Sequence, residues 1–102
     1  MNDSSTTPKT GVVALEVPLQ RGEQHIEQLT LRKPDAGTLR GIKLGDLLQM
    51  DVGALTVLLP RITEPTLTAA DVSKLDAVDL VAIATEVATF FLPMAQRESL
   101  TA

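Results

Sequence analysis

The stretch VVALEVPLQRGEQHIEQLTL, residues 12–31, decides the N-terminal half of the fold. Apolar residues alternate with other residues from Val13 to Leu19, which is the period of a strand with one buried face. The polar segment QRGE at residues 20–23 follows, and its Gly22 can adopt the positive φ of a tight turn. A second strand-like run then ends at Leu31. We therefore predict an antiparallel β-hairpin over residues 12–31.

The second strand does not alternate regularly. Leu29 and Leu31 share one face, whereas Ile26 falls on the other. Either Ile26 packs close to the turn, or a bulge near Glu27 and Gln28 resets the register. Because a lone hairpin is marginally stable in water, it must pack on helices or join the sheet of another copy.

The rest of the domain, residues 35–92, is predicted to be helical. Asp35 is a plausible N-cap for a short helix over residues 36–42. Gly41 and Gly45 interrupt this segment, and two short turns are therefore the better interpretation.

A leucine-rich segment follows with helical spacing. Its apolar residues are Leu44, Leu47, Leu48, Val52, Leu55, Leu58, Leu59 and Ile62. Asp51 can cap a helix that starts at Val52. Pro60 lacks an amide hydrogen and disfavours helical backbone at Leu59, so we expect this helix to end or kink there. Residues 63–66 are predicted to form a loop.

Two further cap signals precede the C-terminal helices. Thr68 and Asp71 have the spacing of a capping box before a short helix. Asp76 can cap a longer helix over residues 77–92. Asp79 is then favoured in its first turn by the helix dipole.

The last helix is apolar on most of its surface. One row consists of Leu80, Ile83, Val87, Phe90 and Met94, and a second of Val81, Ala84, Ala88 and Phe91. Such a helix is normally buried, so core packing is one interpretation. The other is that one row binds another copy or an amphipathic client helix. The candidate partner-binding residues are Leu80, Ile83, Val87, Phe90, Phe91 and Met94.

Together these patterns predict an α+β fold in a single small domain, with an N-terminal antiparallel hairpin followed by about four α-helices. Residues 1–10 are polar and aperiodic and are predicted to be a disordered tail. The domain is expected to span residues 11–94, and residues 95–102 are expected to fray.

Composition excludes several classes of function. The chain has 102 residues, no Cys and a single histidine, His25. Thiolate chemistry is therefore excluded, and we expect no metal, no cofactor and no enzymatic activity. The net charge of −4 and the near absence of aromatic residues argue against nucleic-acid binding.

The sequence also predicts a cytoplasmic protein without a membrane segment. The N-terminus lacks the basic and apolar regions of a secretory signal. The most apolar stretch, from Leu80 to Ala95, has 16 residues, whereas a spanning helix needs about 20.

Several charged residues have ordinary explanations. Asp71, Asp76 and Asp79 could form a metal cluster, but each stands where a helix cap or first turn needs an acid. His25 lies beside the predicted turn and is expected to be exposed. One group of basic residues forms either a solvated face or a contact with an acidic protein: Arg32, Lys33, Arg40 and Lys43.

Four ordered motifs carry a family resemblance. They are LTLRKPDAGTLRG at residues 29–41, LLPRIT at 58–63, PxLT at 65–68 and LDxxDL at 75–80. In this order, with a final FFLP, the chain resembles the tail assembly chaperones of Mu-like bacteriophages and prophages. The resemblance covers roughly residues 12–94.

The resemblance implies a role in phage tail assembly in the cytoplasm of the infected bacterium. Such chaperones are thought to coat the long, helical tape measure protein until tail tube subunits polymerise around it. Many are made in a short form and a longer, frameshifted form. The expected partners are therefore the tape measure protein and other copies of this chain, which would form a homo-oligomer. The alternative is a small structural tail or baseplate-associated protein that is retained in the virion.

Overall fold

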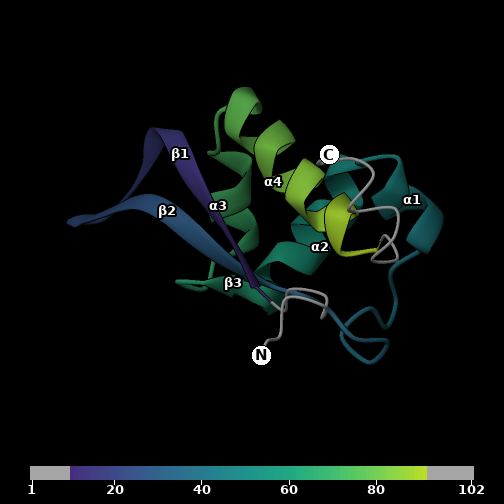
Figure 1. The fold of residues 1–102 in the computed structure, drawn as a ribbon. Helices are drawn as coiled ribbons and strands as arrows, with labels where there is room; N and C mark the ends of the chain where they lie inside the picture. Colours follow the sequence, from purple (N-terminus) through teal and green to yellow (C-terminus); the bar gives the residue numbers. More distant parts are fainter. Residues whose placement is uncertain (1–9, 92–102) are drawn as a thin grey trace, which may run out of the picture.

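The computed structural model describes residues 10–91 (Figure 1). Its elements are β1 (Thr10–Arg21), β2 (Gln24–Arg32), α1 (Leu44–Leu48), α2 (Val52–Ile62), β3 (Thr63–Glu64), α3 (Ala69–Ser73) and α4 (Ala77–Phe90). The predicted α+β class, a hairpin followed by four helices, is confirmed. Thr10, placed in the predicted tail, begins β1. The predictions for residues 1–9, for Met94 and for residues 95–102 fall outside the described residues.

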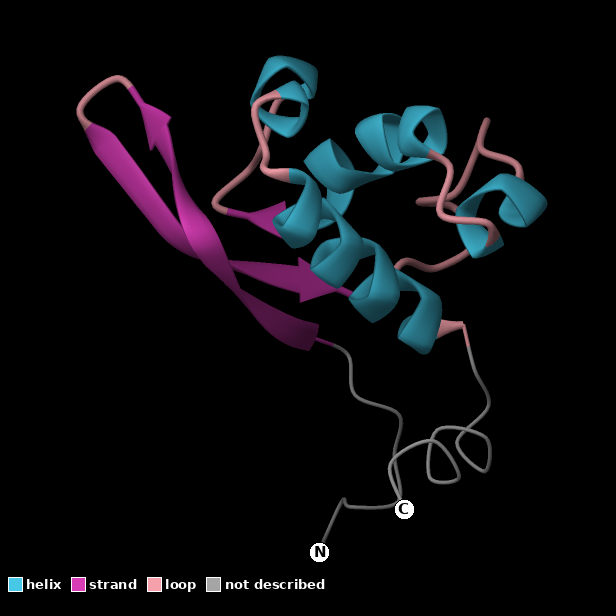
Figure 2. Ribbon diagram, turned by 90° about the horizontal axis from the view of Figure 1, so that it is seen from above, coloured by secondary structure: helices cyan, strands magenta, loops and turns pink. Residues whose placement is uncertain are grey.

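The helices gather on one side of the sheet (Figure 2). The strands contribute buried residues such as Leu29 and Leu31 to the core, and the longest helices contribute Leu58, Ile83 and Val87. All five side chains are fully buried. The core therefore forms between one face of the sheet and the packed helices.

The hairpin contains the predicted turn and an irregularity that was only partly predicted. Gly22 has a φ of 62°, as its place in the turn requires. The pairs Ala14↔Gln28 and Leu19↔Ile26 leave four residues of β1 opposite one residue of β2. The register shift thus lies close to the predicted bulge, but the additional residues are in the first strand.

This shift changes which residues of β1 are buried. Val13, Leu15 and Leu19 face the core, whereas Val17, predicted on the same face, is 51% exposed. Ile26 is buried together with Leu29 despite their odd spacing, because the pairing is reset between them.

A loop was predicted over residues 63–66, after α2. This prediction is wrong at Thr63 and Glu64, which form the third strand, β3. Thr63 and Glu64 pair antiparallel with Leu31 and Thr30. The Thr63 hydroxyl donates to the Leu59 carbonyl at 2.8 Å and accepts from the next loop's backbone at 3.0 Å. These bonds bind the end of α2 to the sheet edge.

Helix α2 was predicted to end or kink at Pro60, and the first of these alternatives is wrong. The helix is capped by Asp51 as predicted, since the Asp51 carboxylate accepts from the Ala54 N–H at 2.8 Å. It nevertheless continues through Pro60 to Ile62. Leu59 and Ile62 are both buried, and each burial contributes about 2 kcal/mol, which outweighs one lost backbone hydrogen bond.

Residues 36–41 form turns, in agreement with the two-turn interpretation. The Asp35 carboxylate accepts from the Thr38 N–H at 2.9 Å and from its hydroxyl at 2.8 Å. The Arg61 guanidinium then donates to the carbonyls of Thr38 and Arg40, at 2.8 and 2.9 Å. The turn is therefore fastened to α2 although it is not helical.

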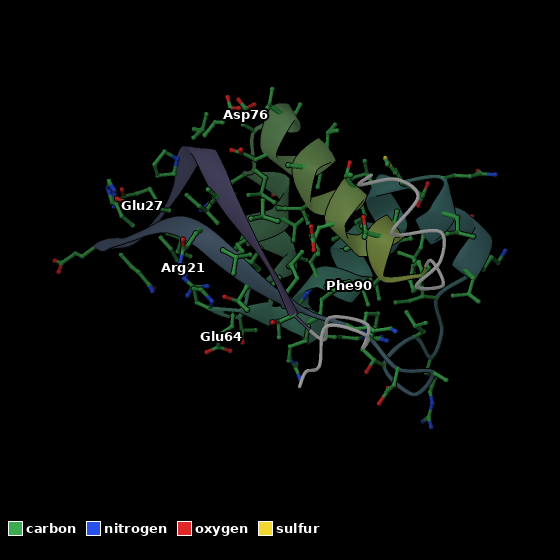
Figure 3. The ribbon with its side chains drawn as sticks, viewed as in Figure 1. Arg21, Glu27, Glu64, Asp76 and Phe90 are labelled. Atoms are coloured by element: carbon green, nitrogen blue, oxygen red, sulfur yellow. The ribbon has the colours of Figure 1, made fainter. Side chains whose placement is uncertain are left out.

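Both predicted cap signals are confirmed. Thr68 and Asp71 form a capping box at the start of α3. The Asp76 carboxylate accepts from the Val78 N–H at 2.9 Å at the start of α4 (Figure 3). Asp71 also forms an ion pair with Arg21 at 2.9 Å, which links α3 to the end of β1.

Candidate interaction surface

The structure places most of the predicted partner-binding row in the core. Ile83, Val87 and Phe90 are at most 1% exposed, and Leu80 and Phe91 are half-buried against the core. In the folded chain, the first three residues can meet a partner only if α4 leaves the sheet. Their binding of a partner stays a prediction.

The exposed face of α4 is short. Ala84 of the second row is also buried, so both rows contribute to the core. Val78 and Val81 are the large apolar side chains that remain outside, at 56% and 58% exposure. Helix α4 alone therefore offers a partner little apolar area.

Exposed apolar side chains are most frequent on α1, on α2 and in the turn between them. Of the nine exposed large apolar side chains in the described residues, five lie within residues 44–57. We call them the α1–α2 surface: Leu44, Leu48, Met50, Val52 and Val57. Leu47 is the buried residue of α1 and packs in the core. Leu44 and Leu48 of the same helix are exposed to solvent.

Met50 in this surface has an unusual backbone. Its φ is 60°, in the left-handed region that favours glycine. The Met50 N–H donates to the Leu47 carbonyl at 3.0 Å, and the Asp51 N–H donates to the Asp46 carbonyl at 2.9 Å. This is the Schellman pattern, in which glycine is the usual residue. A methionine here costs about 1 kcal/mol and holds a flexible apolar side chain in solvent.

The apolar spacing in the sequence did not predict that these side chains are exposed. Leu44, Leu47 and Leu48 share the same helical spacing, so the sequence does not distinguish the buried leucine from the exposed ones. The sequence offered no signal for Met50, because only about a third to a half of helices end with a left-handed residue and no glycine marks this position.

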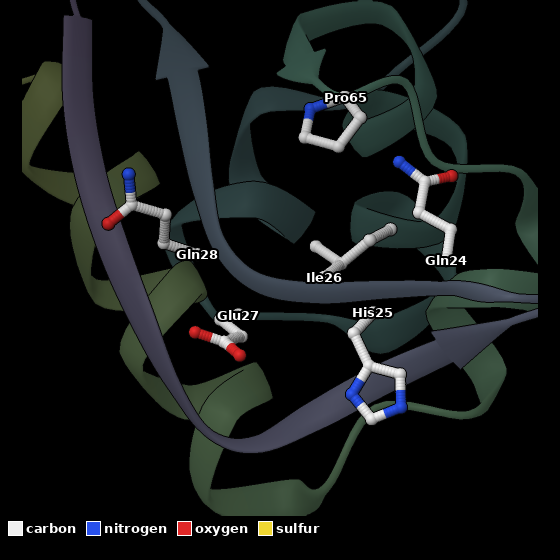
Figure 4. A pocket seen from close by; sticks show the side chains of 6 residues that line it. All are labelled: Gln24, His25, Ile26, Glu27, Gln28 and Pro65. Carbon is white, nitrogen blue, oxygen red and sulfur yellow. The ribbon is translucent and has the colours of Figure 1, made fainter.

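Besides a hollow lined by Thr38, Arg40 and Arg61, two further shallow hollows lie on the described part of the chain. One lies beside the α1–α2 surface and includes Lys43, Asp46 and Val57. The other lies along β2, where Ile26 and Pro65 face each other (Figure 4). His25 and Glu27 also line this hollow, although their side chains point to the opposite side of the strand from Ile26 in this view. His25 is exposed, as predicted.

Among residues 10–91, no three His, Cys, Asp or Glu side chains are grouped to hold a metal ion. In the same part of the chain, no helix has the length and apolar character to cross a membrane.

Comparison with known proteins identifies the family. A sequence model described as phage tail assembly chaperone proteins E, 41 or 14 matches residues 12–92. The chain belongs to this phage tail assembly chaperone family. The matched span contains the hairpin, the α1–α2 surface and α4.

Two relatives in this family come from Escherichia phage P2. Tail assembly protein E is 49% identical over 85 residues, which are 83% of this chain and 93% of that protein. Tail assembly protein E' is 49% identical over 84 residues, which are 82% of this chain but 59% of the relative. The predicted family is thus confirmed. These two relatives come from phage P2 and not from a Mu-like phage. No solved structure matches the chain. Membership indicates a role in phage tail assembly.

Proposed function

We propose that this chain binds the tape measure protein in the host cytoplasm and keeps it soluble while the tail is assembled. The observation that carries the proposal is the α1–α2 surface in a member of a tail assembly chaperone family. A chaperone for an aggregation-prone helical client needs accessible apolar side chains. It also needs enough charge to stay soluble once the client is bound.

The α1–α2 surface suits a helical client. Leu44 and Leu48 are separated by one helical turn, so both side chains project from the same side of α1. Apolar residues three and four apart on a client helix can pack between them. Met50 adds an unbranched side chain that adapts to different client residues. The net charge of −4 opposes aggregation of the loaded complex.

We propose this surface in place of the α4 row as the first contact. Exposing Ile83, Val87 and Phe90 would remove three fully buried side chains from the core, at about 2 kcal/mol each. That total is a large share of the stability of a small domain. A site that is exposed in the folded chain avoids this cost.

The test is co-expression with the tape measure protein of the same phage, followed by pull-down and measurement of soluble client. Leu48→Asp with Val52→Asp alters the α1–α2 surface at side chains that are 56% and 55% exposed. Val78→Asp with Val81→Asp is the matched control on α4, at 56% and 58%.

We expect the wild-type chain and the control to keep the client soluble and the first variant to lose it. Equal activity of all three would refute the α1–α2 surface as the site. Client that precipitates with every chain would refute the chaperone function itself. Retention of the chain in purified particles, measured by mass spectrometry, would favour the structural role instead.

A further inference from the structure

Strand β1 forms an edge of the sheet. The strand order is β1-β2-β3, and within residues 10–91 β1 is hydrogen-bonded to β2 alone among the strands. The helices gather on one side of the sheet (Figure 2), where α4 packs against β1. An edge strand presents unpaired N–H and C=O groups that another strand can use.

The two halves of this edge differ. The second half contains the register shift and Pro18, both of which hinder pairing with another strand. Its backbone N–H groups at Glu16 and Val17 are bound by the Asp79 carboxylate. The first half, TGVVAL at residues 10–15, contains no proline and no charge, and its pairing with β2 is regular as far as Ala14. It therefore lacks the features that protect an edge strand from association.

The exposed side chain in this half favours strand pairing. Val12 is 59% exposed, more than any other large apolar side chain in the described residues. It is β-branched and lies opposite Thr30, so an added strand would extend a row of β-favouring residues.

We propose that residues 10–14 pair antiparallel with the same segment of a second copy. The two-fold axis would pass at Val12, so that Val12 lies opposite Val12 of the second copy, and the two three-stranded sheets would join into one. Such an isologous contact buries Val12 of each copy against its partner.

Charge opposes the approach of a second copy least along this edge. Each chain has a net charge of −4, so copies repel one another over most of their surface. Residues 10–15 carry no charge, and repulsion is therefore smallest along this edge. The carboxylate of Glu86 lies against Gly11. Gly11 pairs with the buried Leu31, so that contact is on the helix-covered face rather than at the edge. A helical client satisfies its own backbone groups and cannot replace the second strand.

Dimerisation would change how a long client is held. Two joined copies carry two α1–α2 surfaces, and binding at the first raises the effective concentration of client at the second. This consequence rests on the proposed function, whereas the pairing itself does not.

The experiment measures the mass of the full chain by light scattering after size exclusion, at tens to hundreds of micromolar. Val12→Lys places like charges across the proposed two-fold axis. Val81→Lys is the matched control, since both valines are exposed to the same extent, at 59% and 58%. We expect twice the chain mass of 10.9 kDa for the wild type and the control, and a single chain mass for Val12→Lys.

Hydrogen exchange provides a second measurement that does not depend on a variant. The amides of residues 10–14 should exchange more slowly as the wild-type chain is concentrated, while those of α4 should not change. A wild-type monomer throughout the range would overturn the proposal. So would a Val12→Lys variant of double mass, or exchange at residues 10–14 that is independent of concentration.

Discussion

The carboxylate of Asp79 binds the backbone of Glu16, 63 positions earlier in the chain. The Glu16 N–H donates to Asp79 Oδ1 at 2.7 Å, and the adjacent Val17 N–H donates to Oδ2 at 3.0 Å. Asp79 is 1% exposed, so the first turn of α4 is fixed directly to the irregular part of β1. The irregularity leaves these two N–H groups without partners on β2, and the carboxylate satisfies both.

We expect Asp79→Ala to destabilise the domain by about 3 kcal/mol, because two charge-assisted hydrogen bonds are lost and two partly buried N–H groups remain unpaired. The measurement is urea unfolding followed by circular dichroism. Asp76→Ala is the control, since it removes a local cap worth about 1 kcal/mol. Equal losses for the two variants would show that Asp79 acts as an ordinary first-turn acid.

Val87→Asp should abolish the folded state. Val87 is fully buried, and an unpaired charge at such a position costs several kcal/mol, comparable with the whole stability of a small domain. Val81→Asp, at 58% exposure, should change the free energy of unfolding by less than about 0.5 kcal/mol. Thermal unfolding of both variants provides the comparison. A cooperatively folded Val87→Asp chain that fails to bind client would instead support the α4 row as a binding face.

Met50→Gly should stabilise the fold while weakening client capture. Glycine relieves the cost of the left-handed backbone, which exceeds its greater unfolded-state entropy, for a gain of up to about 1 kcal/mol. It also removes an exposed apolar side chain from the α1–α2 surface. The two readouts are the melting temperature and the amount of soluble client in co-expression. A higher melting temperature with unchanged capture would mean that Met50 does not contact the client.

Acid should weaken the contact between β1 and α3. The N–H of Thr68 is the main cause of a lowered Asp71 pKa; Arg21 also lowers it, and burial acts in the opposite direction. A carboxyl whose folded-state pKa is depressed contributes stability above its unfolded pKa and loses it as the pH falls through the folded value. The contribution is therefore present at neutral pH and disappears below about pH 4.

Melting temperatures of the wild type and Asp71→Asn across this range test the expectation. The gap between them should be widest near neutral pH and should narrow in acid. Arg21→Met should move the loss of stability to higher pH, because the Asp71 pKa then lies closer to its ordinary value. A gap that is constant with pH would exclude a contribution from Asp71 ionisation.

The exposed residues of the candidate site could not be predicted from the sequence. Apolar spacing predicted that α1, α2 and α4 are amphipathic or buried. It could not decide which apolar side chains remain outside, because that depends on which elements pack together. Ile83 and Leu48 belong to equally apolar segments, yet one lies in the core and the other is 56% exposed. Met50 became noticeable only when its backbone conformation was known.

Features that depend on neighbours along the chain could be predicted from residue order alone: the hairpin with Gly22 at its turn, and the caps formed by Asp51, Thr68 and Asp76. These interactions form within a few residues, so spacing and residue type are sufficient to predict them. Only the tertiary structure decided the helical continuation through Pro60, the third strand and the contact between Asp79 and β1. Each of these joins segments distant in sequence. Burial and long-range hydrogen bonds there outweigh local preference, and no local pattern encodes them.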